Sequence, residues 1–180
     1  VWQAKRDFGT RSIFMGLDQL EFDKVGKDPV EVIILEGETD LATFKQCGYK
    51  NVISVPMGAP SENAKNFDRE FEYLEDPYFK NQVLPFVHKF IVIGDNDASG
   101  RLLKKELCRR IGADKCYNVK FPEGYNDPNE IYSGNISKKL NAKGKIGIDE
   151  LYQSAEPIPI KGIIRVSQVE DDINEFRKHG

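Results

Sequence analysis

"FIVIGDNDASGRLLKKE", residues 90–106, fits the ligand spacing of two unrelated kinds of metal site. As a calcium-binding EF-hand loop it has acidic residues at positions 1, 3 and 12 and glycine at position 6, and it departs from that pattern only at position 5, where Ser99 stands. The same letters also describe a strand that ends in the pair Asp95 and Asp97, an arrangement common at magnesium-dependent phosphotransfer sites. The flanking residues decide between these interpretations.

The residues before Asp95 favour the strand. They read "PFVHKFIVIG", in which residues 90–93 form a largely β-branched apolar run shortly after Pro85. An EF-hand loop needs a helix on each side and normally works in pairs, and no other acidic cluster has glycine at position 6 with glutamate at position 12. We therefore prefer the strand, and Glu106, the apparent twelfth calcium ligand, becomes an ordinary helix residue.

Short apolar runs alternate with helical patterns along the chain. Strands are predicted at the start of 31–40 and in 51–56, 89–94 and 115–122. Helices are predicted up to Gly48 with Thr39 or Asp40 as the cap, over 62–77 and over 99–112. Strands joined by helices form a mainly parallel sheet with helices on its faces, and functional residues gather beyond the carboxyl ends of the strands. The predicted fold class is therefore Rossmann-like α/β.

Acidic residues stand at two of these strand ends. Glu36 and Glu38 follow the first strand, and Asp95 and Asp97 follow the third. If the two strands are neighbours, these carboxylates meet at one rim of the sheet, where they repel each other unless cations neutralise them. Because carboxylate oxygens favour hard cations, we expect Mg²⁺ or Mn²⁺, held together with water and substrate phosphate.

The overall composition excludes several classes of protein. The 180 residues, 39% of them hydrophobic, suffice for one domain, or for one domain with a small appendage. No apolar run approaches the ~20 residues that span a bilayer and no signal-peptide pattern opens the chain, so we expect a soluble intracellular protein. Cys47, Cys108 and Cys116 lack metal-ligand spacing, so we expect no zinc and assign these cysteines to the core.

Positive charge is concentrated in one segment. The net charge of −3 argues against a protein that coats nucleic acid without sequence preference. Residues 101–120, however, contain seven lysines or arginines against two acidic residues, directly after the Asp-x-Asp pair. A solvated helix face is the simplest interpretation. A surface that meets an anionic, metal-bridged substrate is the alternative.

The two acidic motifs together resemble the Toprim domain of primases and topoisomerases. "EGETDLATFKQCGYKNVISVPMGA" (36–59) is similar to a segment of phage primase-helicases and mitochondrial Twinkle, and "FIVIGDNDASGR" (90–101) is similar to their Asp-x-Asp strand end. "FPEGYNDPNEIY" (121–132) resembles their downstream acidic segment, although Asn126 replaces a lysine. The resemblance covers roughly residues 12–175.

This resemblance implies a primase core, which synthesises short RNA primers on single-stranded DNA. The 3'-hydroxyl of one nucleotide attacks the α-phosphate of a nucleoside triphosphate, and two divalent ions, Mg²⁺ or Mn²⁺, can stabilise the attacking and leaving oxygens. The carboxylates that match the family's catalytic and metal-binding positions are Glu36, Asp95 and Asp97, with Asp127 as a further metal ligand. Those expected to support them are Glu38 and Asp40.

Basic residues and glycines near the motifs have expected roles as well. Candidates for contact with nucleotide or DNA are Arg101, Lys5, Arg6 and Arg11, for which solvated surface is an equally good interpretation. Gly37 is expected to permit a tight turn, and Gly100 to let a helix begin beside the site.

The chain is predicted to have three parts. Residues 1–30 would belong to an N-terminal basic primase subdomain, 31–154 to the Toprim catalytic core, and 155–180 to a linker and helix that lead to a helicase domain. No G-x-x-x-x-G-K-[ST] motif is present, and the chain begins with Val1, so we expect an excised piece of a larger primase-helicase.

The expected partners are those of such a primase-helicase. They are a single-stranded DNA template, nucleoside triphosphates, the helicase domain of the same polypeptide and other subunits of a ring, with no membrane. The expected location is the cytoplasm of a phage-infected bacterium, or a mitochondrion or plastid.

Two other functions stay open from the sequence. One is a DNA-cleaving Toprim enzyme, a topoisomerase or a nuclease; a topoisomerase needs a reactive tyrosine on another domain, and the seven tyrosines here have no such context. The other is a non-catalytic DNA-binding module of a Twinkle-like helicase. The presence of all the acidic positions argues against that module.

Overall fold

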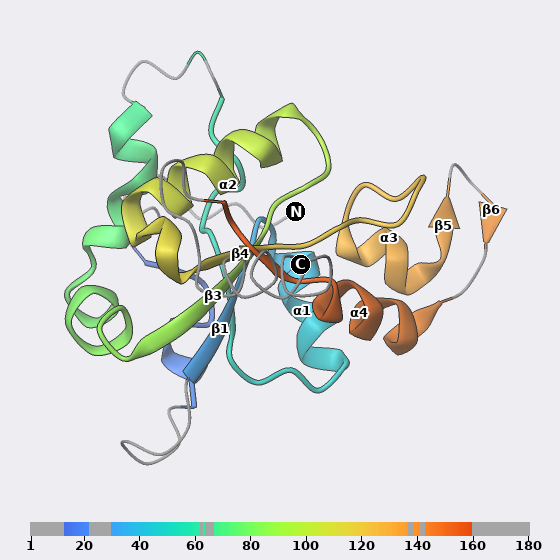
Figure 1. The fold of residues 1–180 in the computed structure, drawn as a ribbon, viewed down its shortest axis with the longest axis horizontal. Helices are drawn as coiled ribbons and strands as arrows, with labels where there is room; N and C mark the ends of the chain where they lie inside the picture. The colour runs from blue at the N-terminus through green and yellow to red at the C-terminus, as the bar shows by residue number, and fades with distance from the viewer. Residues whose placement is uncertain are drawn as a thin grey trace, which may run out of the picture.

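A computed structural model describes residues 13–21, 30–61, 63, 67–136, 139–140 and 143–159. Its centre is a five-stranded sheet of order β2-β1-β3-β4-β7 (Figure 1). The strands are β1 (Val30–Leu35), β2 (Val52–Ser54), β3 (Val87–Ile93), β4 (Cys116–Asn118) and β7 (Glu156–Pro157). β1 to β4 run parallel and β7 runs antiparallel to β4. The predicted mainly parallel α/β fold is confirmed.

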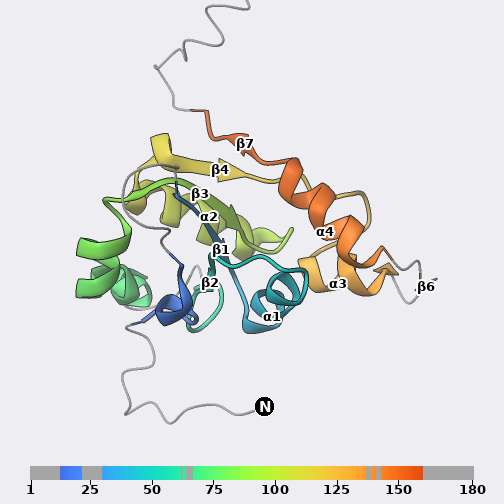
Figure 2. The same cartoon turned by 90° about the horizontal axis from the view of Figure 1, so that it is seen from below.

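The two central strands, β1 and β3, are apolar on both sides because helices cover both faces of the sheet. Val32 and Val92 belong to one hydrophobic cluster, and Ile33 and Ile91 to the other. One face is covered by α2 (Ala98–Ile111), the 3-10 helix η3 (Phe67–Glu75) and the π-helix η4 (Phe79–Val83). The other is covered by α1 (Glu38–Gln46), α3 (Pro128–Ser133) and α4 (Gly144–Gln153) (Figure 2).

The register of the sheet brings three strand ends to the same rim. Leu35, the last residue of β1, is paired with Ser54 at the end of β2 and with Ile93 at the end of β3. Glu36 and Gly94 therefore leave the sheet side by side. This pairing confirms that the first and third predicted strands are neighbours.

α2 shows why the segment after β3 forms a helix. Leu103, Leu107 and Ile111, spaced four residues apart, are buried against the sheet. The Asp97 side chain caps the first turn by accepting a hydrogen bond from the Gly100 N–H at 2.8 Å. Gly112 follows the last turn at a φ of 115°, which favours glycine. The helix begins and ends close to the predicted limits.

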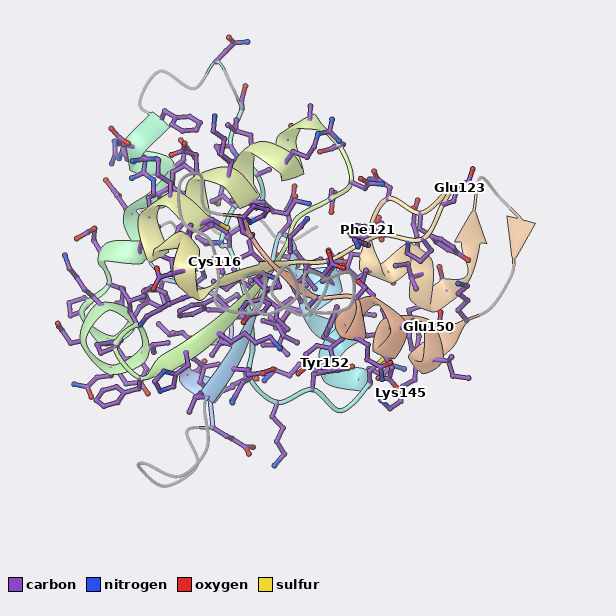
Figure 3. All side chains as sticks on the ribbon, in the orientation of Figure 1. Cys116, Phe121, Glu123, Lys145, Glu150 and Tyr152 are labelled. Atoms are coloured by element: carbon purple, nitrogen blue, oxygen red, sulfur yellow. The ribbon has the colours of Figure 1, made fainter. Side chains whose placement is uncertain are left out.

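The chain after β4 returns to the sheet. Tyr152 lies on α4 (Figure 3). Its hydroxyl donates a hydrogen bond to Glu31 of β1 at 2.6 Å, which holds that helix against the sheet. β7 then pairs with β4, and the Ile158 N–H donates to the Cys116 carbonyl. The first residues of the predicted linker thus add a fifth strand. The division into three parts stays a prediction.

The segment predicted as one helix over 62–77 differs from that prediction. The described residues form η3, with a non-helical Phe71 (φ −112°, ψ 16°), and then η4 after Pro77. Phe71, Tyr73 and Leu74 are all buried, and a regular α-helix does not place residues at i, i+2 and i+3 on one narrow face. Core packing therefore distorts the helical spacing.

The remaining elements are short. They are η2 (Leu17–Gln19), η5 (Ala113–Lys115) and the two-stranded pair β5 (Asn135–Ile136) and β6 (Lys139–Leu140). The three cysteines are free and buried, which confirms their assignment to the core. No helix among the described residues is long and apolar enough to cross a bilayer. Lys5, Arg6, Arg11 and the helix predicted to follow the linker within residues 155–180 lie outside the described residues.

Candidate functional site

Glu36 links the ends of the strands at the acidic rim. Its Oε2 accepts a hydrogen bond from the Asp95 N–H at 2.9 Å, and its Oε1 accepts one from the Ala59 N–H at 3.3 Å. Ala59 belongs to the loop after β2, so this carboxylate joins segments that follow three neighbouring strands. The carboxylate of Glu36 is thereby held next to the backbone of the Asp-x-Asp turn.

The turn from β3 into α2 is packed too tightly for side chains at two glycines. A Cβ at Gly100 would lie 2.2 Å from the Asp95 carbonyl oxygen, and one at Gly94 would lie 2.7 Å from the Gly100 carbonyl oxygen. Gly100 therefore lets the first turn of α2 press against the backbone of Asp95. This contact fixes where the Asp95 carboxylate leaves the chain.

Gly37 does not have the role predicted for it. Its φ of −130° is extended, and a Cβ there would lie 3.5 Å from Asp40 Oδ2, an ordinary contact. α1 begins at Glu38 with Gly37 as its N-cap residue and without a side-chain cap, so the predicted capping by Thr39 or Asp40 is also wrong. Asp40 instead turns toward the loop that carries Asp127.

Asp127 reaches the rim from the segment after β4. It caps α3 by accepting a hydrogen bond from the Glu130 N–H at 2.7 Å, and Glu130 accepts one from the Asn126 N–H at 2.7 Å. The Asn96 N–H donates to the Asn126 carbonyl at 2.8 Å. The last bond ties the Asp-x-Asp turn directly to the residue before Asp127.

Asp40 is the most enclosed of the acidic residues, with 5% of its surface exposed. Its Oδ1 accepts a hydrogen bond from the Asn129 N–H at 3.2 Å. Burial, together with the negative charges of Asp127 and Glu36, raises the pKa of Asp40 to about 7. Glu38, predicted as a second supporting carboxylate, is exposed in the first turn of α1.

Asp95 lies at the electrostatic centre of the rim. Burial raises its pKa to about 7, and the charges of Glu36, Asp40, Asp127 and Asp97 add to that effect in this order. Each of the other predicted carboxylates except Glu38 therefore raises the pKa of Asp95. Burial raises the pKa of Asp127 too. The rim carries more negative charge than it can hold without a cost in free energy.

The donor set at the rim suits a hard divalent cation. It consists of carboxylate oxygens, and their mutual repulsion would be relieved by bound positive charge. Among the residues that the structure describes, no three His, Cys, Asp or Glu side chains stand close enough to form a ready-made metal site. Asp97 and Asp127 each turn an oxygen toward a helix N-terminus instead. These residues fit the cation in chemistry and charge, but their side chains are not gathered around one point.

Basic side chains stand beside the Asp-x-Asp turn. The exposed Arg101 folds back and donates from Nη1 to the Asn96 carbonyl at 3.4 Å. Lys104, one turn further along α2, donates to Asn118 Oδ1 at 3.2 Å. The sequence placed Lys104 in the basic segment without singling it out. Its spacing of three residues from Arg101 places both side chains on one face of a helix, which could have identified Lys104 as a second basic residue near the site.

The sequence analysis also did not identify Asn129 and Glu130 as residues of the site. Their segment "DPNE" (127–130) has an aspartate at the N-cap, a proline at the first helical position and a glutamate at the third. This capping box places Asp127 at a helix start. Recognising it would have predicted α3.

Comparison with known proteins agrees with the geometry. The family model described as "Toprim domain" matches residues 30–120, about half of the chain. The chain is 31% identical over 184 residues to the Twinkle homolog protein, chloroplastic/mitochondrial, of Arabidopsis thaliana, covering 95% of this chain and 24% of that protein. It is 32% identical over 163 residues to the primase homolog protein of the same plant, covering 84% of this chain and 43% of that protein.

The chain thus spans less than half the length of either relative. Among solved structures, a DNA primase domain from Pseudomonas aeruginosa has a similar fold, with a TM-score of 0.52 and 17% identity over 86% of this chain and 42% of that one. The resemblance drawn from the two acidic motifs is confirmed by the family match over the strands that carry them. The chain belongs to the Toprim domain family.

Proposed function

We propose that this chain is the catalytic core of a primase-helicase and joins ribonucleotides into short primers on single-stranded DNA. The observation that carries the proposal is the position of Asp95, surrounded by the charges of Glu36, Asp40, Asp97 and Asp127 at the rim of a Toprim sheet. The names of the two plant relatives, a Twinkle homolog and a primase homolog, support the same reaction.

The proposed chemistry assigns a task to each carboxylate. The 3'-hydroxyl oxygen forms a bond to the α-phosphorus of the incoming nucleotide, the bond to pyrophosphate breaks, and the hydroxyl proton passes to a base. We assign the base to Glu36, whose side chain is oriented by two backbone N–H groups. Asp95 and Asp97 would hold a divalent cation, with Asp127 as a further ligand and Asp40 and Glu38 in support.

Mg²⁺ or Mn²⁺, two ions in the complete site, would supply charge stabilisation of the attacking and leaving oxygens. The residues of this chain provide what that chemistry needs around the reacting groups. Gly100 fixes the position of Asp95, and the N-cap bond of Asp97 fixes the start of α2. Arg101 is placed to meet the charge of the triphosphate.

The proposed partners follow from the same relatives. Because the chain covers 24% of the Twinkle homolog, we propose that a helicase domain belongs to the same polypeptide and that the full-length protein forms a ring. A single-stranded DNA template and nucleoside triphosphates are the proposed substrates. We also propose a mitochondrion or plastid as the compartment, since the Twinkle homolog is named for both organelles.

A synthesis assay tests the proposal. The chain and a longer protein that includes the helicase region would be incubated with labelled ribonucleotides, single-stranded templates and Mg²⁺ or Mn²⁺. We expect short oligoribonucleotides, at least with the longer protein, and their loss in Asp97→Asn. If the longer protein makes none and instead nicks supercoiled DNA, the chain is a DNA-cleaving Toprim enzyme. If it does neither but retains DNA binding, it is a non-catalytic module.

A further inference from the structure

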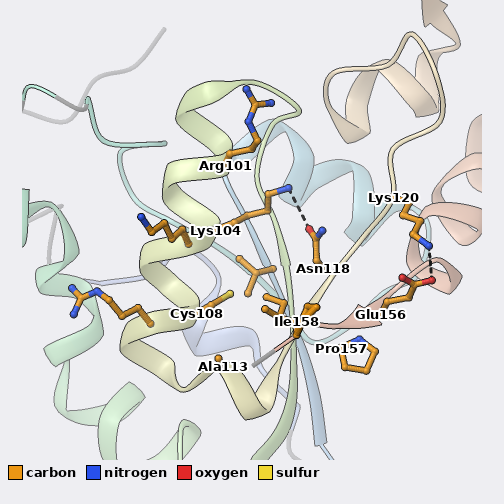
Figure 4. Close-up of a pocket in the computed structure, with 13 residues that line it drawn as sticks. Arg101, Lys104, Cys108, Ala113, Asn118, Lys120, Glu156, Pro157 and Ile158 are labelled. Atoms are coloured by element: carbon orange, nitrogen blue, oxygen red, sulfur yellow. Dashed lines mark hydrogen bonds and ion pairs between the residues drawn. The ribbon is translucent and has the colours of Figure 1, made fainter. Parts of the chain in front are cut away.

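A groove of about 660 Å³ runs along α2 between that helix and residues 156–159 (Figure 4). Apolar side chains form part of its lining, among them Val92, Cys108 and Ile158. One end is marked by Arg101, which is bonded to the Asp-x-Asp turn through Asn96. We call this feature the α2 groove. It begins at the carboxylate rim and leads away from it.

The walls of the α2 groove carry an excess of positive charge. Five cations and one carboxylate line it: Arg101, Lys104, Lys105, Arg109, Lys120 and Glu156. Lys120 pairs with Glu156 at 2.6 Å, and Arg109 pairs with Glu106 on the same helix at 2.8 Å. Within the described residues, no carboxylate forms an ion pair with the remaining three. The uncompensated charge therefore lies at the end of the groove nearest the rim.

The environment of Lys104 shows that the excess positive charge in the groove is unfavourable in free energy. Its amine is half-buried and donates to Asn118, a neutral partner, across the groove (Figure 4). Burial lowers the pKa of Lys104, and the neighbouring charge of Arg101 lowers it further. The negative charge of Glu36 acts in the opposite direction, so this amine is within electrostatic reach of the carboxylate rim. Bound anionic groups would stabilise both cations.

We propose that the α2 groove binds the sugar-phosphate backbone of a nucleic-acid strand that continues past the carboxylate site. Arg101, Lys104 and Lys105 share one face of α2 at spacings of three and four residues, so they can meet successive phosphates. Because the groove follows α2 from Arg101 to Arg109, it suits a polymer better than a single nucleotide. That the strand is template or primer rests on the proposed function, whereas its phosphodiester chemistry does not.

The test compares two double variants with equal loss of charge. Lys104→Gln with Lys105→Gln removes two cations of the groove. Lys50→Gln with Lys80→Gln removes two exposed cations elsewhere, one beside the opposite edge strand β2 and one in η4. Binding of labelled single-stranded DNA and single-stranded RNA would be measured by fluorescence anisotropy over a range of salt concentrations, without metal or nucleotide.

We expect the groove variant to bind about tenfold more weakly than the control variant. The slope of log K against log salt should fall by about 1.4 for a single strand, since each lost phosphate contact contributes about 0.7. A loss confined to DNA assigns the groove to the template, a loss confined to RNA assigns it to the primer, and a loss for both supports the shared backbone chemistry.

Equal affinity and equal salt slopes in the two variants would overturn the proposal and leave the groove to another occupant, such as an acidic protein segment. Absence of measurable binding by the unsubstituted chain at low salt would overturn it too. Thermal unfolding checks that the groove variant is folded, and we expect no loss of stability because a half-buried charge is removed. Since binding is measured without nucleotide, its failure is distinct from a failure of primer synthesis.

Discussion

Gly100 is the residue on which the geometry of the Asp-x-Asp turn depends. No side chain fits between the first turn of α2 and the backbone of Asp95, where a Cβ would lie 2.2 Å from the carbonyl oxygen. Gly37, in the other acidic motif, has room for a Cβ. The two glycines look equivalent in the sequence and differ in the structure because only one faces another segment of backbone.

This difference predicts unequal effects on stability. Gly100→Ala should lower the free energy of unfolding by about 3 kcal/mol, because α2 would have to move away from β3. Gly37→Ala should cost less than about 1 kcal/mol, the loss of a favourable N-cap residue. Urea denaturation of both variants measures the two values. Equal losses would show that the close contact at Gly100 does not constrain the turn.

Asp97→Asn should abolish primer synthesis while leaving the fold intact. An asparagine oxygen can still accept the Gly100 N–H and cap α2, but the negative charge is lost. We expect a rate at least about 100-fold lower and a free energy of unfolding within about 0.5 kcal/mol of the unsubstituted value. The measurements are ribonucleotide incorporation and denaturation. Activity close to that of the unsubstituted protein would remove Asp97 from the mechanism.

Glu36→Gln should affect the stability of the protein as well as its activity, unlike Asp97→Asn. Both carboxylate oxygens of Glu36 accept backbone N–H groups, from Ala59 and Asp95, and glutamine has only one acceptor oxygen. One N–H would then face an amide NH₂, which costs about 1 kcal/mol or more. We therefore expect Glu36→Gln to lower the free energy of unfolding as well as the rate of primer synthesis.

The raised pKa values of Asp40 and Asp95 predict a stability that depends on pH. Both rise from 3.8 to about 7, so between these values the folded protein binds more protons than the unfolded chain. The free energy of unfolding should therefore fall as pH rises from about 4 to about 7. Each group alone would account for about 3 kcal/mol between pH 5 and pH 8, and because the two carboxylates repel each other we expect a combined loss of about 3 to 5 kcal/mol without divalent cations.

Asp40→Asn provides the control for this pH dependence. Its amide oxygen can still accept the Asn129 N–H, while the buried charge is absent. Denaturation at a series of pH values should show a flatter profile and a variant that is more stable than the unsubstituted protein at pH 8. An unchanged profile would mean that Asp40 is ionised in the folded protein at no cost.

At the scale of elements, β3 and α2 distinguish the two interpretations of residues 90–106, a calcium-binding EF-hand loop and a strand that ends in an Asp-x-Asp pair. β3 precedes Asp95, as predicted, so the segment lacks the entering helix of an EF-hand. Glu106, at the twelfth calcium position, instead forms ion pairs with Arg109 and Arg110 on its own helix. These pairs hold its carboxylate among cations of the helix rather than toward Asp95 and Asp97.

Glu106→Gln should consequently leave primer synthesis within about twofold of the unsubstituted rate. The change should cost about 1 kcal/mol of stability, because the glutamine oxygen can still accept from the arginines and ion pairs within one helix contribute little. Calcium titration followed by calorimetry offers a second readout. Tight calcium binding that disappears in Glu106→Gln would restore the EF-hand interpretation.

The sequence predicted well the elements whose apolar residues form a continuous run or a regular repeat. β1, β3 and α2 combine an apolar run or a four-residue repeat with clear stop signals. η3 and η4 were predicted poorly because aromatic residues of the core pull the backbone out of regular helical geometry. α4 and β7 were not predicted, since their partners, β1 and β4, are distant in the sequence.

At the scale of the whole molecule, the acidic rim gathers residues from three separate parts of the chain. A divalent cation should therefore stabilise the entire fold by relieving repulsion between segments. We expect Mg²⁺ at about ten times its dissociation constant to raise the unfolding temperature by about 3 °C at pH 8. The effect should be smaller at pH 5, where protons already neutralise Asp40 and Asp95.

Differential scanning calorimetry with and without Mg²⁺ at both pH values measures this coupling. A double variant, Asp95→Asn with Asp97→Asn, is the matched control and should show no Mg²⁺-dependent shift. An equal shift at the two pH values, or an equal shift in the double variant, would place the cation elsewhere on the molecule.

The sequence by itself determined the class of fold, the positions of the first four strands along the chain and the acidic residues at the ends of two of them. These features are local, because the hydrophobic periods of strands and helices, and the motifs at strand ends, depend only on residues close together in the sequence. Only the tertiary structure decided that Asp40 is buried, that Asp127 reaches the rim through the bond between Asn96 and Asn126, and that basic residues of α2 face a groove. Those properties arise where segments distant in the sequence pack together, and burial and charge at such contacts depend on the folded chain as a whole.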